Sequence, residues 1–276
     1  NSPVVITADT ATGINFSGAL VYMNDFEGKV TKINLTNMET DGTEEANPVS
    51  LYDTTTLFWS DSSSANGRYM YHSMDATIGA TTNQLWLFGG TGNIDRINSN
   101  EDTVNNIMFG IKDENYPYFK KIIEPEIITE RNLALCNNTS DDVDGSLCPE
   151  SADLGWYITL PNFGKVTNEP TVAKGYVYFP VYEPTTSVNL CDLGNAYLCS
   201  VDDECGTNNS SLIGDFAESS DKCWYAGTGV ISKVVTFGDK IFANISGETS
   251  TKGDLISAEG LASDTSGYRS SWGENY

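Results

Sequence analysis

The tetrapeptide LWLF, which directly precedes the glycine-rich run GGTG, limits the possible folds of this chain more than any other segment. In an extended strand, Leu85 and Leu87 point to one face while Trp86 and Phe88 point to the other. Both faces of this strand are therefore apolar, and the strand is expected to be buried on both sides. We interpret the segment as part of one blade of a repeated β-structure.

The glycines after this strand indicate a return of the chain. Gly89, Gly90 and Gly92 are expected to supply the positive φ angles that a tight turn needs, and the following NNIMFGIKD has the pattern of a second strand. A phosphate-binding loop is excluded because GGTGN is not followed by the lysine and the helix that bind phosphate. The sequence predicts a β-turn here.

Strand and turn patterns recur along the chain. They lie at residues 20–35, 175–183, 195–201 and 239–247. In GYVYFPVYE, the tyrosines fall on one face and the valines and phenylalanine on the other, which is the period of two of a strand. With 276 residues, 39% of them hydrophobic, the chain can bury a large core. We expect an all-β fold and one domain over residues 1–276, the C-terminal part of a longer precursor.

The composition excludes two kinds of partner. The formal net charge is −23, from 38 acidic against 15 basic side chains, whereas nucleic-acid recognition needs clustered lysine and arginine. No apolar run approaches the roughly 20 residues of a membrane-spanning helix. The acidity favours solubility outside the cell, and a basic partner surface or calcium is the alternative reason for it.

The cysteines are even in number and lie in the second half of the chain. No pair has the CxxC spacing of zinc or redox sites, so disulfides and an oxidising compartment are favoured. Pairing of Cys136 with Cys148 is expected, whereas the remaining pairing is open, with Cys199 to Cys205 and Cys191 to Cys223 preferred. The six are Cys136, Cys148, Cys191, Cys199, Cys205 and Cys223.

One acidic loop, NMETDGTEE at residues 37–45, carries oxygen ligands at alternating positions around a glycine. Asn37, Glu39, Asp41 and Glu45 have the spacing of calcium ligands, but position twelve is Pro48 and not the glutamate of a standard EF-hand. An acidic surface hairpin loop is the favoured interpretation, and a calcium site is the alternative.

The sequence offers little for catalysis. His72 is the only histidine and has no neighbouring base or nucleophile motif, so a packed or surface role is favoured over a catalytic one. The sequence therefore predicts a protein that is not an enzyme and that holds no cofactor apart from the calcium alternative.

Four segments, in order, resemble the C-terminal β-propeller domain of the PilY/PilC family of type IV pilus proteins. LVYMNDFEGKVTKINL is similar to the blade strand Y-x-G-D-x-x-G of the family, with Asn24 in place of glycine. LWLFGGTGNID with MFGIKDEN resembles its F-G-T-G and G-x-x-D pair. The run from LGWYITLP to SVNLC resembles its G-W-Y-x-x-L-P, x-P-x-V and F-x-x-Y-x-P segments, and SSWGENY its closing S-W-R-E, with Gly273 in place of arginine.

The resemblance implies a propeller, and the long loops leave room for four or five blades in this chain. It also implies a non-enzymatic protein at the tip of type IV pili, exported through the periplasm to the cell surface. Such a protein binds minor pilins, supports pilus assembly and adhesion, and contacts a host or surface ligand through an upstream region. Completing a larger propeller needs residues upstream of Asn1 or another chain.

The sequence departs from the family pattern in one loop, and two other functions are alternatives to the pilus role. The calcium loop that well-studied members carry before the first blade strand is replaced here by ATGINFSGA, so family calcium regulation does not transfer to that loop. A quinoprotein-like propeller enzyme is one alternative, although the vicinal cysteines, repeated tryptophan motifs and basic cofactor ligands of that class are missing from the sequence. A structural component of another surface filament is the second alternative.

Overall fold

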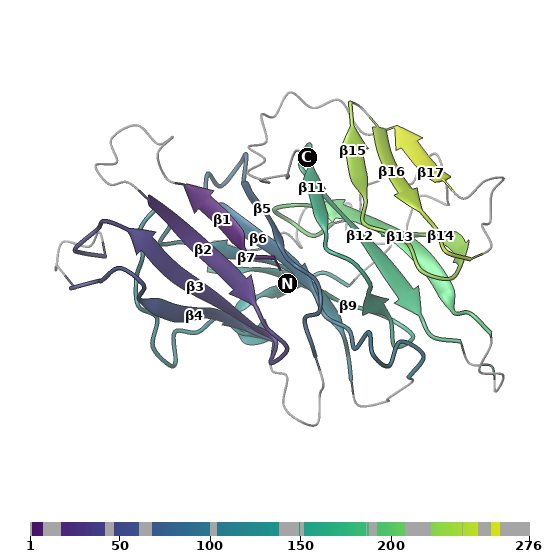
Figure 1. The fold of residues 1–276 in the computed structure, drawn as a ribbon, viewed down its shortest axis with the longest axis horizontal. Helices are drawn as coiled ribbons and strands as arrows, with labels where there is room; N and C mark the ends of the chain where they lie inside the picture. Colours follow the sequence, from purple (N-terminus) through teal and green to yellow (C-terminus); the bar gives the residue numbers. More distant parts are fainter. Residues whose placement is uncertain are drawn as a thin grey trace.

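The structure of the chain is a computed structural model. It describes residues 2–7, 18–41, 47–60, 68–99, 104–137, 149, 152–185, 187, 192–207, 222–238 and 240–247, and the backbone of residues 255–259. Within these ranges the regular structure is all β apart from one short 3₁₀ turn, η1 at Glu130–Asn132. The strands form four sheets that follow one another in chain order, from the purple strands at the left of Figure 1 to the yellow ones at its upper right.

Each sheet is built mainly from strands that are consecutive in the sequence. The first contains β1 (Val4–Thr7), β2 (Gly18–Asn24), β3 (Lys29–Thr36) and β4 (Thr54–Trp59). The second contains β5 (Asp75–Ile78), β6 (Leu85–Gly90), β7 (Ile107–Asp113), β9 (Gly155–Thr159) and β8 (Ala134–Leu135). Pairing within both is antiparallel except that β8 runs parallel to β9.

The third and fourth sheets continue the pattern. The third contains β10 (Lys165–Val166), β12 (Tyr176–Glu183), β13 (Asn195–Asp202) and β14 (Cys223–Thr228), with β11 (Thr171–Ala173) also paired to β12. The fourth contains β15 (Val235–Phe237), β16 (Lys240–Asn244) and β17 (Leu255–Glu259). The four sheets confirm the all-β prediction and correspond to the lower of the two expected numbers of blades.

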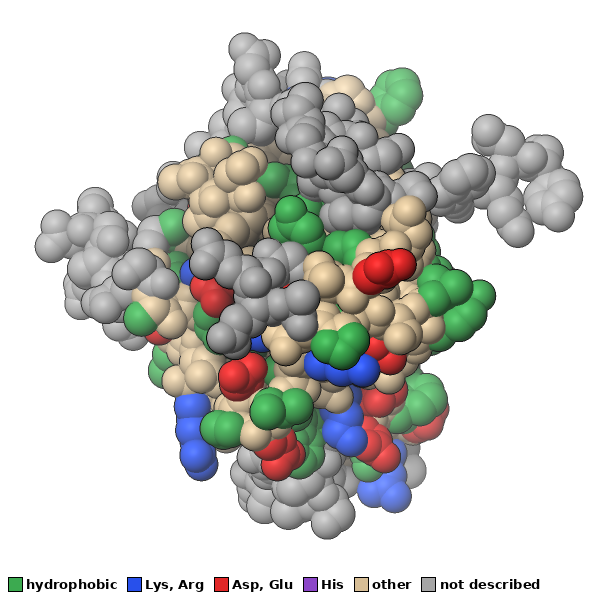
Figure 2. All heavy atoms as spheres, turned by 90° about the vertical axis from the view of Figure 1, so that its left-hand side faces the viewer, with side chains coloured by type: hydrophobic (Ala, Val, Ile, Leu, Met, Phe, Trp, Pro, Cys, Tyr) green, Lys and Arg blue, Asp and Glu red, His purple; other side chains and the backbone are tan. Residues whose placement is uncertain are grey.

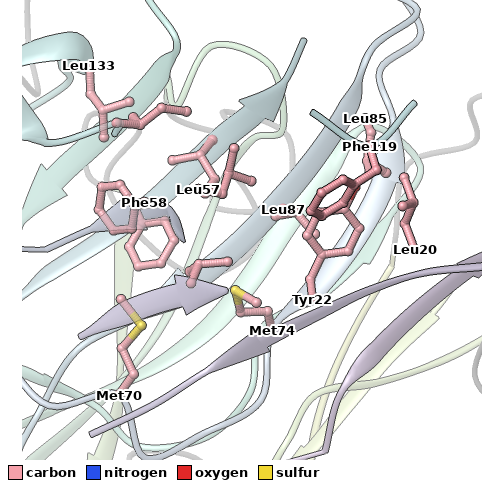
Figure 3. Packing of buried hydrophobic residues seen from close by; sticks show 14 of the residues in the cluster. Leu20, Tyr22, Leu57, Phe58, Met70, Met74, Leu85, Leu87, Phe119 and Leu133 are labelled. Atoms are coloured by element: carbon pink, nitrogen blue, oxygen red, sulfur yellow. The ribbon is translucent and has the colours of Figure 1, made fainter. Parts of the chain in front are cut away.

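The apolar core consists of three clusters, one between each pair of successive sheets. Leu85 and Leu87 on one face of β6 join the cluster against the first sheet, and Figure 3 shows them beside Leu20 and Tyr22 of β2. Trp86 on the other face joins the cluster against the third sheet. The prediction from LWLF is confirmed, because this strand is buried on both sides.

Strand β12 shows the same alternation. Val177 and Phe179 pack toward the second sheet, whereas Tyr178 packs toward the fourth. Sheets that bury both faces between neighbours are the arrangement of propeller blades. The period of two in GYVYFPVYE therefore marks an inner blade.

The glycines after LWLF do not have the predicted role. Gly89, Gly90 and Gly92 are not among the residues with positive φ, and β6 runs on to Gly90. A Cβ atom on Gly90 would lie 2.3 Å from Cγ2 of Val166, and one on Gly92 would lie 2.7 Å from Cβ of Lys165. These glycines permit close approach of β10, and a long connection rather than a tight turn follows them.

The segment after β7 covers two outer sheet edges. Ile128 forms a parallel bridge with Phe58 of β4, and its backbone exchanges hydrogen bonds with Leu57 and Trp59. Farther along, β8 adds to β9 in the same parallel sense. Covering an edge strand in this way removes a template for aggregation.

Candidate functional site

The acidic loop at residues 37–45 lies at the end of the first sheet where β3 leaves it. Thr40 forms an antiparallel bridge with Pro48, whereas residues 42–46 lie outside the described ranges. Asp41 is buried and accepts a hydrogen bond of 2.8 Å from Nδ2 of Asn47. Glu39 and Asn37 are exposed, and Glu45 lies outside the described residues.

Calcium binding by this loop stays a prediction. Among the described side chains, no group of three or more histidine, cysteine, aspartate or glutamate residues is placed to hold a metal ion. The structure brings Asp41 to the side-chain amide of Asn47. Calcium would need ligands beyond these two to complete a shell of six to eight oxygens.

The disulfide pairing differs from the preferred prediction. Cys199 is bonded to Cys223, because the antiparallel register of β13 and β14 places these two residues directly opposite each other. Cys205 is also disulfide-bonded, so its predicted bond to Cys199 is wrong, as is the bond predicted between Cys191 and Cys223. Sequence spacing could not reveal this, because register across a sheet is not a sequence distance.

The other predicted pair involves a residue that is not described. Cys136 is buried in the cluster between the second and third sheets, and its Sγ lies 3.2 Å from the backbone oxygen of Cys205. Its expected partner, Cys148, and Cys191 lie outside the described ranges. Cys136, Cys199 and Cys223 nevertheless meet at one interface, which the sequence did not predict.

His72 lies in the segment that leads into β5 and is half-buried. Burial lowers the pKa of its imidazole, and its Nε2 makes no hydrogen bond to any residue in the described part of the chain. Its backbone oxygen accepts a 2.8 Å hydrogen bond from Nδ2 of Asn24. Asn24, the departure from the family glycine, thus ties the end of β2 to the second sheet.

A buried ion pair joins the first and second sheets, and sequence reasoning missed it. Nζ of Lys32 lies 2.6 Å from Oδ2 of Asp113, and the two side chains are 1% and 0% exposed. Lys32 also donates to the backbone oxygen of Tyr118, and the hydroxyl of Tyr22 donates to Asp113. The available signal was the alternation of β3, which places Lys32 on the same face as the buried Val30.

Burial at this junction shifts the pKa values of Tyr22 and Lys32. Burial, the largest cause, raises the pKa of Tyr22 well above its usual value, and the charge of Asp113 raises it further. Burial also lowers the pKa of Lys32 against the attraction of Asp113. The site is closed to solvent, so we assign it to stability rather than to binding.

A second acidic group, Asp202 to Glu204, links the third sheet to the second. The carboxylate of Glu204 accepts hydrogen bonds of 2.6 and 2.8 Å from the backbone N–H groups of Thr81 and Thr82. Burial and, next, the charges of Asp202 and Glu204 raise the pKa of Asp203 to about 7. Through Glu204, this acidic group connects the loop after β13 to the loop between β5 and β6.

Four exposed apolar side chains among the described residues lie on two loops that meet at the β3–β4 end of the first sheet. We call this surface the Tyr52 patch. It consists of Leu51 and Tyr52 from one loop and Tyr118 and Ile123 from the other, which are 52%, 70%, 37% and 68% exposed. Figure 2 shows hydrophobic, basic and acidic side chains side by side on the described part of this side of the molecule.

Among the described residues, no helix is long and apolar enough to cross a bilayer. No protein-family model matches the sequence. A search of the curated proteins finds no match either.

A search of the solved structures, in contrast, finds a protein with a similar fold. The chain is similar to the crystal structure of the Pseudomonas aeruginosa PilY1 C-terminal domain, with a TM-score of 0.56 and 13% sequence identity. The match covers 94% of this chain and 60% of that chain, so this chain spans less than two thirds of the matched structure's length. Three of the four resembling segments lie on the strands described above, and SSWGENY lies outside the described residues. In its fold, this chain is a PilY1 C-terminal-like domain of the β-propeller type.

Proposed function

We propose that this chain is a non-enzymatic protein of type IV pili, of the PilY/PilC class, that acts outside the cell at the pilus tip. Its function would be to bind minor pilins and so support pilus assembly and adhesion. The observation that carries the proposal is the match of 94% of the chain to the PilY1 C-terminal domain. The order of the resembling segments along the chain supports the same class.

The structure is suited to a rigid binding module. Each inner sheet is buried on both faces, and loops at the sheet ends carry the exposed side chains. Binding residues commonly lie on loops that a rigid scaffold positions. The function would therefore depend on loops at the sheet ends and not on a catalytic pocket.

The disulfide supports an exported location. Cys199 and Cys223 are bonded within the third sheet, and such bonds form and persist in oxidising compartments. A mature protein that crosses the periplasm and resides at the cell surface would meet this condition. Calcium, if bound, would act at the acidic loop of residues 37–45, and calcium titration followed by thermal unfolding tests that part separately.

The test of the proposal is localisation on the pilus. Pili sheared from cells that produce an epitope-tagged chain should carry the tag, and immunogold labelling should find it at filament ends. Deleting the gene should lower the number of surface pili. Labelling at regular intervals along the filament would instead support a structural subunit, and a quinone absorbance band in the purified protein would support the propeller-enzyme alternative.

A further inference from the structure

We propose that the Tyr52 patch is the surface through which this protein docks on a pilus subunit, and that the partner offers an apolar surface bordered by lysine or arginine. This inference rests on the function proposed above and adds the place and chemistry of contact. Large apolar patches on soluble proteins mark interaction sites, whereas single exposed apolar residues are normal.

The two loops that carry the patch are held side by side because they are bonded to each other. Asp53, beside Tyr52, lies 3.0 Å from Nζ of Lys121. Below them, Oγ1 of Thr55 donates to the backbone oxygen of Ile122 at 3.1 Å and accepts from its N–H at 2.7 Å. Ile123 and Tyr52 are thus presented together by a fixed pair of loops.

Tyr52 occupies a backbone conformation that does not suit its side chain. Its φ is +70°, in the left-handed region where a bulky residue is strained and glycine is preferred. The turn is closed by hydrogen bonds between Ser50 and Asp53, so it does not depend on the ring of Tyr52. A strained tyrosine that is 70% exposed contributes little to its own fold, and strain of this kind collects at functional sites.

The residue types of the patch suit a protein partner. Tyrosine is enriched among residues that dominate binding energy, since its ring gives large contact area at low entropic cost. Leu51 and Ile123 flank it with aliphatic surface. By comparison, Phe237 is 80% exposed at the tip of the β15–β16 hairpin, and its exposed neighbour on β15 is the aliphatic Val235 at 51%.

The charges around the patch favour a partner whose surface is basic. Four carboxylates border it against two lysines, and both lysines are paired, Lys121 with Asp53 and Lys120 with Glu126. Glu114 and Glu124 remain exposed. With a net charge of −23, two copies of this chain repel each other, so a basic border on a different protein is favoured over self-association. The carboxylates are Asp53, Glu114, Glu124 and Glu126.

The sharpest test uses Tyr52→Gly, which should raise stability while it weakens binding. Glycine relieves the positive φ, so the thermal midpoint should stay equal or rise, whereas removing the ring should weaken association with sheared pili by about tenfold or more. Asn83→Gly is the matched control, because Asn83 also has a positive φ of 51° in an exposed turn away from the patch. Its binding should equal that of the wild type.

A second variant examines the opposite loop. Ile123→Ser should weaken binding to the same sheared pili without lowering the thermal midpoint, because the side chain is 68% exposed. Phe26→Ala removes an exposed aromatic ring at the opposite end of the first sheet and should leave binding unchanged. Binding should weaken as salt rises, since the charged border contributes by screened attraction.

The outcomes separate this inference from the function on which it rests. If the wild-type domain binds sheared pili and Tyr52→Gly and Ile123→Ser bind equally well, docking occurs elsewhere and the inference is wrong. If the wild-type domain does not bind pili at all, the proposed function fails. A concentration-dependent dimer in sedimentation that Tyr52→Gly abolishes would assign the patch to a second copy and overturn the choice of partner.

Discussion

The two interfaces of the second sheet are built from different chemistry, although they are the two faces of the same strands. Toward the first sheet, an apolar cluster surrounds the buried charges of Lys32 and Asp113. Toward the third sheet, Trp86 and Trp156 form an aromatic cluster that contains the buried Cys199. Both interfaces are mainly apolar; a buried ion pair is added at the first, and close aromatic packing marks the second.

Because of this difference, different substitutions are expected to destabilise the two interfaces. A buried ion pair is weak evidence for stability but costs heavily when one partner is removed. A tightly packed interface is sensitive to added volume, because protein interiors are as dense as organic crystals. Three sets of substitutions test this contrast, from the largest expected effect to the smallest, and a fourth prediction concerns pH.

The largest effect is expected from Asp113→Asn. It leaves the ammonium of Lys32 buried without its counter-ion, which should lower the free energy of unfolding by about 3–5 kcal/mol in urea denaturation. The double variant Lys32→Met with Asp113→Asn should recover most of the loss, since it removes both charges and keeps an acceptor for Tyr22. Equal stability of the single and double variants would show that the charge is not the cause.

Loss of the disulfide should have the next largest effect. Replacing Cys199 and Cys223 together by alanine should cost about 2–4 kcal/mol, because the bond closes a loop with a sequence separation of 24 and limits the unfolded chain. Chemical denaturation measures this loss. A map of peptides from the unreduced protein provides the check, and a peptide that joins Cys199 to Cys205 would contradict the pairing.

The packing between β6 and β10 predicts a smaller effect. Gly90→Ala places a methyl group against Val166, which should lower the free energy of unfolding by about 1–3 kcal/mol through overpacking. Adding Val166→Ala should restore part of that stability by making room. If Gly90→Ala alone is neutral in thermal unfolding, the close approach of these strands is wrong.

The last prediction concerns the dependence of stability on pH, which should arise at the interface between the second and third sheets. Asp203, whose backbone oxygen accepts a hydrogen bond from Nε1 of Trp156, has a pKa raised to about 7 from its usual 3.8. Between these values the folded state holds more protons than the unfolded state, so stability should fall as pH rises from about 4 to 7. Asp203→Asn should flatten that part of the stability profile, and an unchanged slope would argue against the shift.

The sequence predicted the parts of this fold that depend on local pattern. LWLF predicted a strand buried on both faces and GYVYFPVYE predicted a strand with two distinct faces, because the period of a strand assigns each side chain to a face. It failed where two strands distant in the chain must meet. Gly90 was interpreted as a turn residue because glycine is common in turns, whereas only the approach of Val166 explains its lack of a side chain.

The candidate sites also fall into those visible in the local sequence and those that depend on contacts between distant residues. The acidic loop at residues 37–45 is visible as a candidate in its own residues, but the bond of Cys199 to Cys223 depends on the register between β13 and β14. The Tyr52 patch was not predicted, since it joins loops that are far apart in sequence. A signal for it existed only in part, as the exposed pair Leu51 and Tyr52 in a turn.

By itself, the amino-acid sequence determined an all-β chain of repeated hairpins, its strong acidity and its resemblance to a pilus-associated family, because these follow from residue type and spacing. Only the tertiary structure decided which face of each sheet holds charge, which cysteines meet and which loops share a surface. The physical reason is that sheet register, close packing and exposure arise from contacts between residues far apart in the chain.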